Sequence, residues 1–129
     1  SKPAKTPEAR APEFLARPLL LPPQLRAVYE ALRTALPQHI VLAQVQLGAL
    51  LEIAPGSTGF ERETRETRLA ARVDFVVCDA LFKTLAVVNA SGDKPALRAC
   101  CEGAGLRWVV VQPGAPPDTA TLRRWVLPG

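Results

Sequence analysis

Three short apolar runs in the second half of the chain constrain its fold more than any other feature. The runs Val73 to Cys78 and Leu85 to Asn89 are rich in β-branched residues, and only Asp79 to Thr84 separates them, which is short enough for a β-hairpin. The third run, Trp108 to Val111, is almost wholly apolar, as is typical of a central strand covered on both faces. These runs predict three strands of one sheet.

A helical pattern lies between the second and third runs. Apolar residues recur at helical spacing from Lys94 to Ala104, Asp93 is placed to cap the start of this helix, and Pro95 suits its first turn. The segment from Leu85 to Val111 therefore predicts a right-handed crossover between two parallel strands. The earlier strands are expected to form an antiparallel meander.

The first half of the chain predicts one more helix and one more strand. Pro22 and Pro23 precede an apolar stripe at helical spacing, and Pro37 ends it. From Ile40 to Leu47 the period changes to two, which predicts a strand. Its expected faces carry Val41, Ala43, Val45 and Leu47 on one side and Gln44 and Gln46 on the other.

The segment from Gly48 to Arg68 is less regular. Gly48 to Ile53 reads as a short helical or irregular piece, and a loop follows at Pro55 to Gly59. Residues 61–68 alternate in charge, which favours an exposed helix or ordered loop over a specific anion site. Its weak ion pairs are expected to join Glu61 to Arg65 and Arg62 to Glu66.

A last helix is predicted from about Asp118. It is expected to pack Leu122, Trp125 and Val126 inward and to leave Arg123 and Arg124 outside, and Trp108 is expected in the core like Trp125. The element order is then α, β, a variable connection, β, β, α, β, α. This order predicts an α/β domain with a mixed central sheet flanked by helices.

The N-terminal residues have the composition of a linker. Pro3, Pro7, Pro12 and Pro18 lie among Ala, Lys, Glu and Arg, which favours an extended, weakly ordered segment over residues 1–18. Residues 19–129 are then expected to form one domain. The linker could tether this domain to a membrane anchor or to another domain upstream, while the domain itself is expected to make no membrane contact.

The composition indicates a protein of a reducing compartment with a mild excess of positive charge. Cys78, Cys100 and Cys101 are an odd number of cysteines without a C-x-x-C pair, so free, mostly buried thiols and a cytoplasmic location are expected. The net charge is +4, but the sequence contains no run of Lys or Arg that would form a nucleic-acid patch. No apolar run approaches the roughly 20 residues that span a bilayer.

The order and spacing of five segments raise a family resemblance. The chain resembles, over about residues 19 to 126, a bacterial family catalogued as domain of unknown function 2726, within the PD-(D/E)XK nuclease superfamily. This resemblance implies a restriction-endonuclease-like αβββαβ core. The segments that carry it are Leu19-Leu20-Leu21-Pro22, Leu42-Ala43-Gln44-Val45-Gln46-Leu47, Val73-Asp74-Phe75-Val76-Val77-Cys78-Asp79, Leu85-Ala86-Val87-Val88 and Ala104-Gly105-Leu106.

The resemblance implies a metal-dependent active site, and this chain departs from it. Nucleases of that superfamily hold Mg²⁺ with a carboxylate from one strand and a Glu from the next, followed two positions on by a further polar residue, usually Lys. Asp74 matches the first carboxylate. Asn89 stands at the Glu position and Ser91 two positions later, so at most one anionic metal ligand remains. Asp74 could instead cap a neighbouring backbone segment or pair with an Arg.

Other residues could replace the lost groups. Asp93 and Lys94 lie in the shortened connection after Asn89, although Asp93 is better explained as a helix cap. Glu30 could approach the site from the first helix, although it lies off the apolar stripe and a surface position is favoured. If the domain is active, its candidate residues are Asp74, Asn89, Ser91 and Glu30, with Mg²⁺ as cofactor and Asp74 as metal ligand. Otherwise no catalytic residue and no cofactor is expected.

Three functions remain open at this stage. The first is a catalytically degenerate nuclease-like domain that binds a protein or a nucleic acid, the second an active Mg²⁺-dependent nuclease with a relocated site, and the third a structural or regulatory domain of a tethered protein. Arg72, Arg98, Arg107 and Lys94 are the candidate nucleic-acid contacts. If these residues, together with Arg123 and Arg124, cluster near the cleft, nucleic acid is the expected partner, and if they scatter, a protein is.

Overall fold

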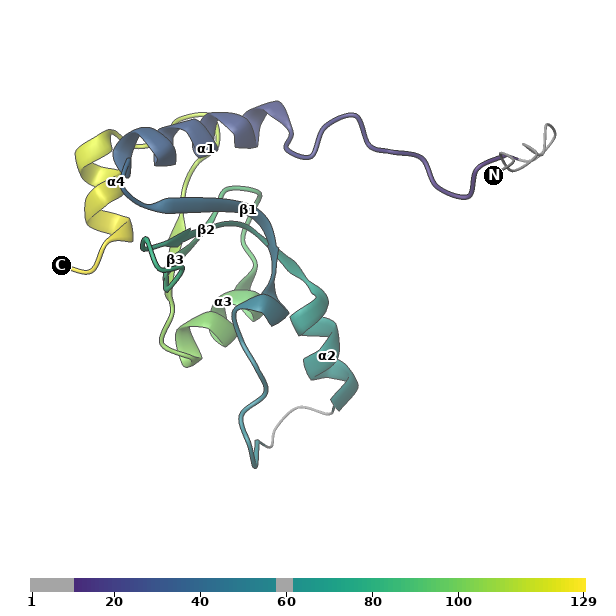
Figure 1. The fold of residues 1–129 in the computed structure, drawn as a ribbon. Coiled ribbons are helices and arrows are strands. Elements are labelled where there is room, and N and C mark those ends of the chain that lie inside the picture. The colour runs from purple at the N-terminus through teal and green to yellow at the C-terminus, as the bar shows by residue number, and fades with distance from the viewer. Residues whose placement is uncertain (1–10, 58–61) are drawn as a thin grey trace, which may run out of the picture.

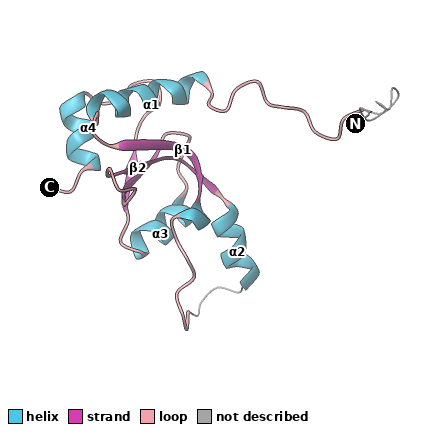
Figure 2. Cartoon of the chain, in the orientation of Figure 1, coloured by secondary structure: helices cyan, strands magenta, loops and turns pink. Residues whose placement is uncertain are grey.

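A computed structural model describes residues 11–57 and 62–129 of the chain. Within these ranges the chain forms four strands, four α-helices and one short 3-10 helix (Figures 1 and 2). In chain order they are α1 (Pro23–Ala35), β1 (Ile40–Gln46), η1 (Leu47–Ala49), α2 (Arg62–Ala70), β2 (Arg72–Cys78), β3 (Thr84–Asn89), α3 (Pro95–Gly103), β4 (Arg107–Val110) and α4 (Thr119–Val126).

The four strands form one mixed sheet in the order β1-β2-β3-β4. β1 pairs antiparallel with β2, and β2 pairs antiparallel with β3. β4 lies parallel to β3 with α3 between them in the chain. The predicted meander, the parallel strand–helix–strand unit and the α/β class are therefore confirmed, and the topology is consistent with an αβββαβ restriction-endonuclease-like core.

Helices cover both faces of this sheet. Figure 1 shows α1 and α4 on one face, and α2 and α3 on the other. Each face has its own apolar cluster. Leu32, Phe75 and Val88 belong to the cluster under α1 and α4, and Val76 and Trp108 to the one beside α3. Because β2 and β3 are buried between both layers, their sequences are nearly continuous apolar runs instead of alternating ones.

The strand β4 departs from the sequence prediction. Trp108 packs on one face of the sheet and Val109 on the other, so both faces are covered as expected. The strand is nevertheless at the edge of the sheet, not in its centre, and Val110 is exposed. An apolar run indicates that both faces of a strand are covered, but it does not indicate whether a neighbouring strand pairs with each of its two edges.

The faces of β1 also differ from the prediction. Val41 and Ala43 pack under α1 and α4, whereas Val45 and Leu47 belong to the opposite cluster. Gln44, between them, has a φ of 58°, which interrupts the strict alternation of side chains. The expected single apolar face is therefore divided at Gln44.

Local residue chemistry sets where the helices begin and end. Pro23 is the first residue of α1, as predicted, and the guanidinium of Arg123 in α4 donates a hydrogen bond of 2.9 Å to the carbonyl oxygen of Ala35 at the end of α1. Asp118 caps α4 by accepting from the Thr121 N–H at 2.8 Å, and this hydrogen bond lowers the pKa of the Asp118 carboxyl. Trp125, expected in the core, is instead 41% exposed on α4.

The start of α3 corrects one prediction about Asp93. The helix begins at Pro95 as the sequence indicated, but its N-cap residue is Lys94, and no side chain of that residue caps the helix. Asp93 is exposed in the preceding turn. The proline alone therefore marks this helix start, because its fixed φ suits the first turn and its missing N–H needs no partner.

The hairpin between β2 and β3 presents apolar residues to solvent. The Asp79 carboxylate accepts hydrogen bonds of 2.9 Å from the N–H groups of Leu81 and Lys83, which shapes the turn. Leu81 and Phe82 are exposed at its tip, and Phe82 has a φ of 66°.

The segment before α1 extends away from the domain (Figure 1). Residues 11–20 form no helix or strand and are exposed. Among the described residues, no helix is long and apolar enough to cross a membrane.

Replacing Gln44 by glycine is expected to be tolerated better than the same change nearby. A φ of 58° is unfavourable for a residue with a Cβ but not for glycine. Gln46→Gly removes a side chain from an ordinary position of the same strand and serves as the matched control. We expect the free energies of unfolding of the two variants to differ by about 1–2 kcal/mol in favour of Gln44→Gly. Urea denaturation measures both, and equal destabilisation would contradict the role assigned to the Gln44 backbone.

Candidate functional site

The candidate site lies where the end of β3 faces the beginning of β2. Phe75 pairs with Val88 in the sheet, so Asp74 and Asn89 come next to each other on the two strands. Both side chains are buried, Asp74 to 3% exposure and Asn89 completely. The two positions that the family resemblance assigned to one site are therefore adjacent in the sheet.

The Asp74 carboxylate is held by the turn that follows β3. Its Oδ2 accepts hydrogen bonds from the N–H groups of Ala90 at 2.7 Å and Ser91 at 2.8 Å. Its Oδ1 accepts from the Ser91 hydroxyl at 2.8 Å and lies 3.6 Å from the Lys94 ammonium. Of the two structural roles considered for Asp74, the backbone cap is present, and the cation beside it is Lys94 in place of an Arg.

Asn89 makes the reciprocal contact to β2. Its side-chain oxygen accepts a hydrogen bond of 3.1 Å from the Asp74 N–H. Its Nδ2 is buried without a hydrogen-bond partner among the described residues. A buried donor left in this way costs about 1–3 kcal/mol. The side-chain NH2 group of Asn89 is therefore unpaired in the described structure, while both carboxylate oxygens of the adjacent Asp74 are engaged.

The chemistry of this donor set does not fit a Mg²⁺ ion. Mg²⁺ prefers near-octahedral oxygen ligands, usually with one or two carboxylates. Here the one carboxylate accepts three hydrogen bonds, and the neighbouring positions supply a neutral amide, a hydroxyl and a cation. Over residues 11–57 and 62–129, no group of three His, Cys, Asp or Glu side chains is placed to hold a metal. A metal ion here would have to displace the hydrogen bonds that hold the turn.

The remaining candidate residues do not add acidic ligands to Asp74. Glu30 is exposed on α1, as favoured from the sequence, and Asp93 is exposed in the turn before α3. The hydrogen bonds and ion pair of the Asp74 carboxylate in the described structure go to Ala90, Ser91 and Lys94. The Lys94 ammonium lies 3.6 Å from Asp74 Oδ1, so Lys94 is close to the candidate site, but its charge neutralises the carboxylate.

Most of the arginines considered as nucleic-acid contacts have partners within the protein. Arg98 pairs with Glu102 on α3 at 3.3 Å, Arg107 donates to the Trp125 carbonyl oxygen, and Arg124 contacts the Thr121 hydroxyl. Arg72 is exposed at the beginning of β2, and Arg123 caps α1. Different elements carry them, and most are engaged by neighbouring residues of their own element or the next.

A groove runs beside the candidate site at the carboxyl ends of the parallel strands β3 and β4. Its volume is about 660 Å³, and Ala90 and Ser91 form part of its wall. This edge is where crevices form in α/β sheets. The other lining residues are Pro22, Gln24, Leu25, Gly92, Asp93, Val110, Val111, Gln112 and Pro113.

Sequence reasoning missed this groove, because its residues come from three distant segments. In the sequence, Pro22 and Leu25 indicate only the start and the apolar stripe of a helix. Val110 and Val111 indicate only a strand. One signal was available: the carboxyl ends of predicted parallel strands point to this edge of the sheet.

The fold and the site together define an α/β domain with a mixed sheet and a single buried carboxylate at the β2–β3 junction. The chain belongs to a family described as protein of unknown function (DUF2726), whose model matches residues 17–126. No curated protein and no solved structure matches the chain.

Removal of the Asp74 carboxylate is expected to destabilise the domain strongly. Asp74→Ala would leave the N–H groups of Ala90 and Ser91 and the Lys94 ammonium without their acceptor. We expect a loss of about 3–5 kcal/mol in the free energy of unfolding, because buried partners are left unsatisfied. Asp93→Ala, an exposed control two residues from Ser91, should change it by less than about 0.5 kcal/mol.

Urea denaturation in the presence and in the absence of Mg²⁺ measures this difference. A stable Asp74→Ala variant would show that the turn does not depend on the carboxylate. A wild-type stability that rises with Mg²⁺ and does not rise in Asp74→Ala would identify Asp74 as a metal ligand.

Proposed function

We propose that this chain is a catalytically degenerate PD-(D/E)XK nuclease-like domain that acts as a protein-interaction module and works without a bound metal. The observation that carries the proposal is the engagement of the Asp74 carboxylate by Ala90, Ser91 and Lys94. In this interpretation the carboxylate holds the turn between β3 and α3.

The replaced neighbours support the loss of catalysis. A nuclease of this type needs negative charge to hold the ion whose bound water attacks the phosphodiester. Asn89 supplies a neutral oxygen, and that oxygen already accepts from the Asp74 N–H. Ser91 stands where a Lys would be usual, and its hydroxyl donates to Asp74. Each replaced residue thus serves the same structural contact.

The character of the groove favours a protein over a nucleic acid as partner. No Lys or Arg is among the described residues that line it, and Asp93 adds a negative charge. Nucleic-acid binding depends on cations that neutralise phosphates. The one cation of the candidate site, Lys94, is only 28% exposed and lies next to Asp74.

The groove offers the features that an extended peptide segment requires. Val110 provides an exposed apolar contact, and the side-chain amides of Gln24 and Gln112 can donate to and accept from a peptide backbone. The exposed edge of β4 ends at this groove. Segments of partner proteins commonly add to such an edge through main-chain hydrogen bonds.

The buried contact would then prepare the binding surface. Ala90 and Ser91 form part of the groove wall, and both are fixed by the Asp74 carboxylate. A wall that is already ordered loses less conformational freedom when a partner binds. This gives a reason for a buried carboxylate to be retained without catalysis.

A cleavage and binding assay tests the absence of nuclease activity. Labelled single- and double-stranded DNA and RNA are incubated with the protein in Mg²⁺, Mn²⁺ or EDTA, and Glu63→Gln, a change at an exposed residue of α2, serves as the folded control variant. We expect no metal-dependent cleavage and no salt-sensitive retention of nucleic acid. Cleavage that requires the metal and is lost in Asp74→Asn would make the domain an active nuclease, and salt-sensitive binding without cleavage would make it a nucleic-acid-binding pseudonuclease.

Site-directed photo-crosslinking tests the groove as the protein-binding surface. A photoreactive amino acid at Gln112 is expected to trap a specific protein in cells that produce the chain, and the same group at Arg98 on α3 is not. Val110→Asp should abolish the product, because it places a charge against the apolar partner surface. Equal products from both positions, or a product that survives Val110→Asp, would contradict the groove assignment.

A further inference from the structure

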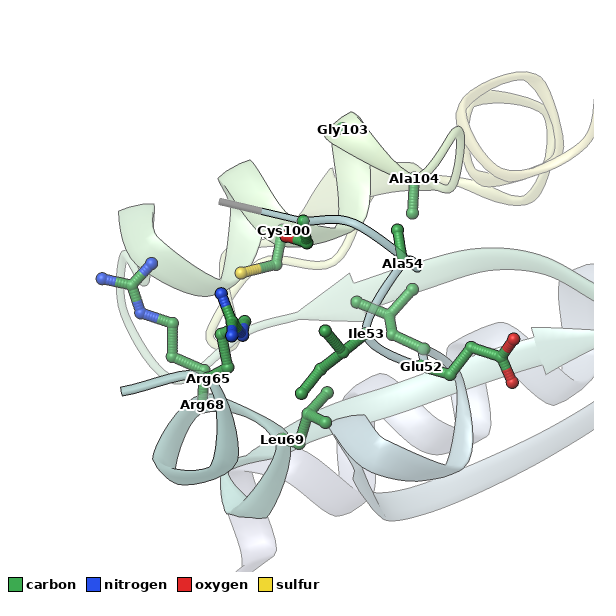
Figure 3. Close-up of a pocket in the computed structure, with 11 residues that line it drawn as sticks. Glu52, Ile53, Ala54, Arg65, Arg68, Leu69, Cys100, Gly103 and Ala104 are labelled. Atoms are coloured by element: carbon green, nitrogen blue, oxygen red, sulfur yellow. The ribbon is translucent and has the colours of Figure 1, made fainter. Parts of the chain in front are cut away.

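A second hollow lies on the other layer of the molecule, between residues 51–57, α2 and α3 (Figure 3). Its volume is about 270 Å³, and it shares no lining residue with the groove described above. The close approach of α2 to η1 helps to form it. Gly48 permits this approach, since a Cβ there would lie 3.2 Å from the Leu69 carbonyl oxygen.

The walls of this hollow are mainly aliphatic. Leu51, Ile53, Ala54, Leu69 and Ala104 line it. Such walls can pack against the aliphatic part of a ligand. The volume limits an occupant to a small molecule.

Two guanidinium groups stand at one side of the hollow. Arg65 and Arg68 are three residues apart on α2, so they share one face of the helix, and both are half-buried. Figure 3 shows both guanidinium groups on the side of the Cys100 sulfur, while the Glu52 carboxylate points away from them. Each arginine also contacts another part of the chain. A guanidinium carries five N–H donors in a planar fork and can therefore serve more than one acceptor at once.

The third arginine of α2 provides a contrast. Arg62 is exposed and pairs with Glu66 at 3.4 Å, as the sequence predicted. The other predicted pair of this segment involves Glu61, which lies outside the described residues. The charge pattern of α2 therefore serves two purposes: Arg62 and Glu66 form a solvated pair, and Arg65 and Arg68 face the hollow.

We propose that this hollow binds a small carboxylate with an aliphatic body. The carboxylate would accept charge-assisted hydrogen bonds from Arg65 and Arg68, and the aliphatic body would occupy the space between Leu51, Ile53 and Leu69. The sequence had favoured a merely exposed helix here over an anion site. The proposal is independent of the partner assigned to the groove, since the two sites have different residues.

Cys100 offers a built-in reporter for this site. Its side chain lines the hollow and is half-buried, whereas Cys78 and Cys101 are buried. Burial raises the pKa of both buried thiols, that of Cys101 to about 11, which suppresses their reactive thiolate forms. A small neutral alkylating reagent should therefore modify Cys100 first, and an occupant of the hollow should block it.

The experiment measures the rate of Cys100 alkylation by iodoacetamide in the folded chain, with peptide mass spectrometry to locate the product. Octanoate is the probe, and octanol and octylamine are probes of the same length without the negative charge. We expect octanoate to slow the modification of Cys100 in a saturable manner, and octanol and octylamine to have much weaker effects. Inorganic phosphate tests the anion without an aliphatic body and should not protect.

Three variants separate the contributions to binding. Arg68→Gln should weaken octanoate protection by about tenfold or more, because a charge-assisted hydrogen bond is lost. Arg62→Gln, on the same helix, is the matched control and should leave protection unchanged. Ala54→Phe should fill the hollow from an exposed segment, so it should slow Cys100 alkylation by itself and leave no further protection by octanoate.

Two results would overturn the proposal. Equal protection by octanol and octanoate would show an apolar hollow without carboxylate recognition. Absence of octanoate protection in the unmodified chain, with Cys100 still the first thiol to react, would show that the hollow does not take this ligand. If Arg68→Gln fails to fold, the comparison of Ala54→Phe with Arg62→Gln still decides whether the hollow is the site.

Discussion

The buried carboxylate of Asp74 links β2 to the turn after β3 and to the residue before α3. A carboxylate taken out of water without partners costs several kcal/mol, so its position between β2 and the turn after β3 requires compensation. Ala90, Ser91 and Lys94 supply that compensation from the turn and from the residue before α3. The beginning of α3 and one wall of the groove are thereby fixed relative to the central strands. The stability of the β2–β3 junction and the shape of the proposed binding surface depend on the same few hydrogen bonds.

The same site illustrates how a metal-type arrangement and a structural one can share residues. A strand carboxylate opposite a polar residue of the next strand is the geometry that the family resemblance implied. With Glu at the second position, two negative charges side by side would need a cation. With Asn89, one negative charge remains, and Lys94 and the N–H groups of Ala90 and Ser91 lie against it. This arrangement leaves the Nδ2 group of Asn89 without an acceptor among the described residues.

The two proposed binding surfaces both arise where layers of the fold leave space between them. The groove lies where the parallel strands β3 and β4 end against the start of α1, and the smaller hollow lies where α2 stands away from α3. Their chemistry differs because different segments line them. Apolar residues, uncharged polar residues and Asp93 line the groove, while two arginines and aliphatic residues line the hollow. These differences lead to a protein segment for the first and a small carboxylate for the second.

Features with a local physical cause could be predicted from the sequence: the start of α1 at Pro23, the hairpin between β2 and β3 and the crossover through α3. Periodicity, proline chemistry and short connections are properties of neighbouring residues. The family resemblance assigned Asp74 and Asn89 to one site, and the two positions are adjacent in the sheet. Only the tertiary structure decided the left-handed backbone at Gln44, the edge position of β4, the exposure of Trp125 and the partners of Asp74. Each depends on which distant segments pack together, and the free energy of that packing is not contained in any one stretch of sequence.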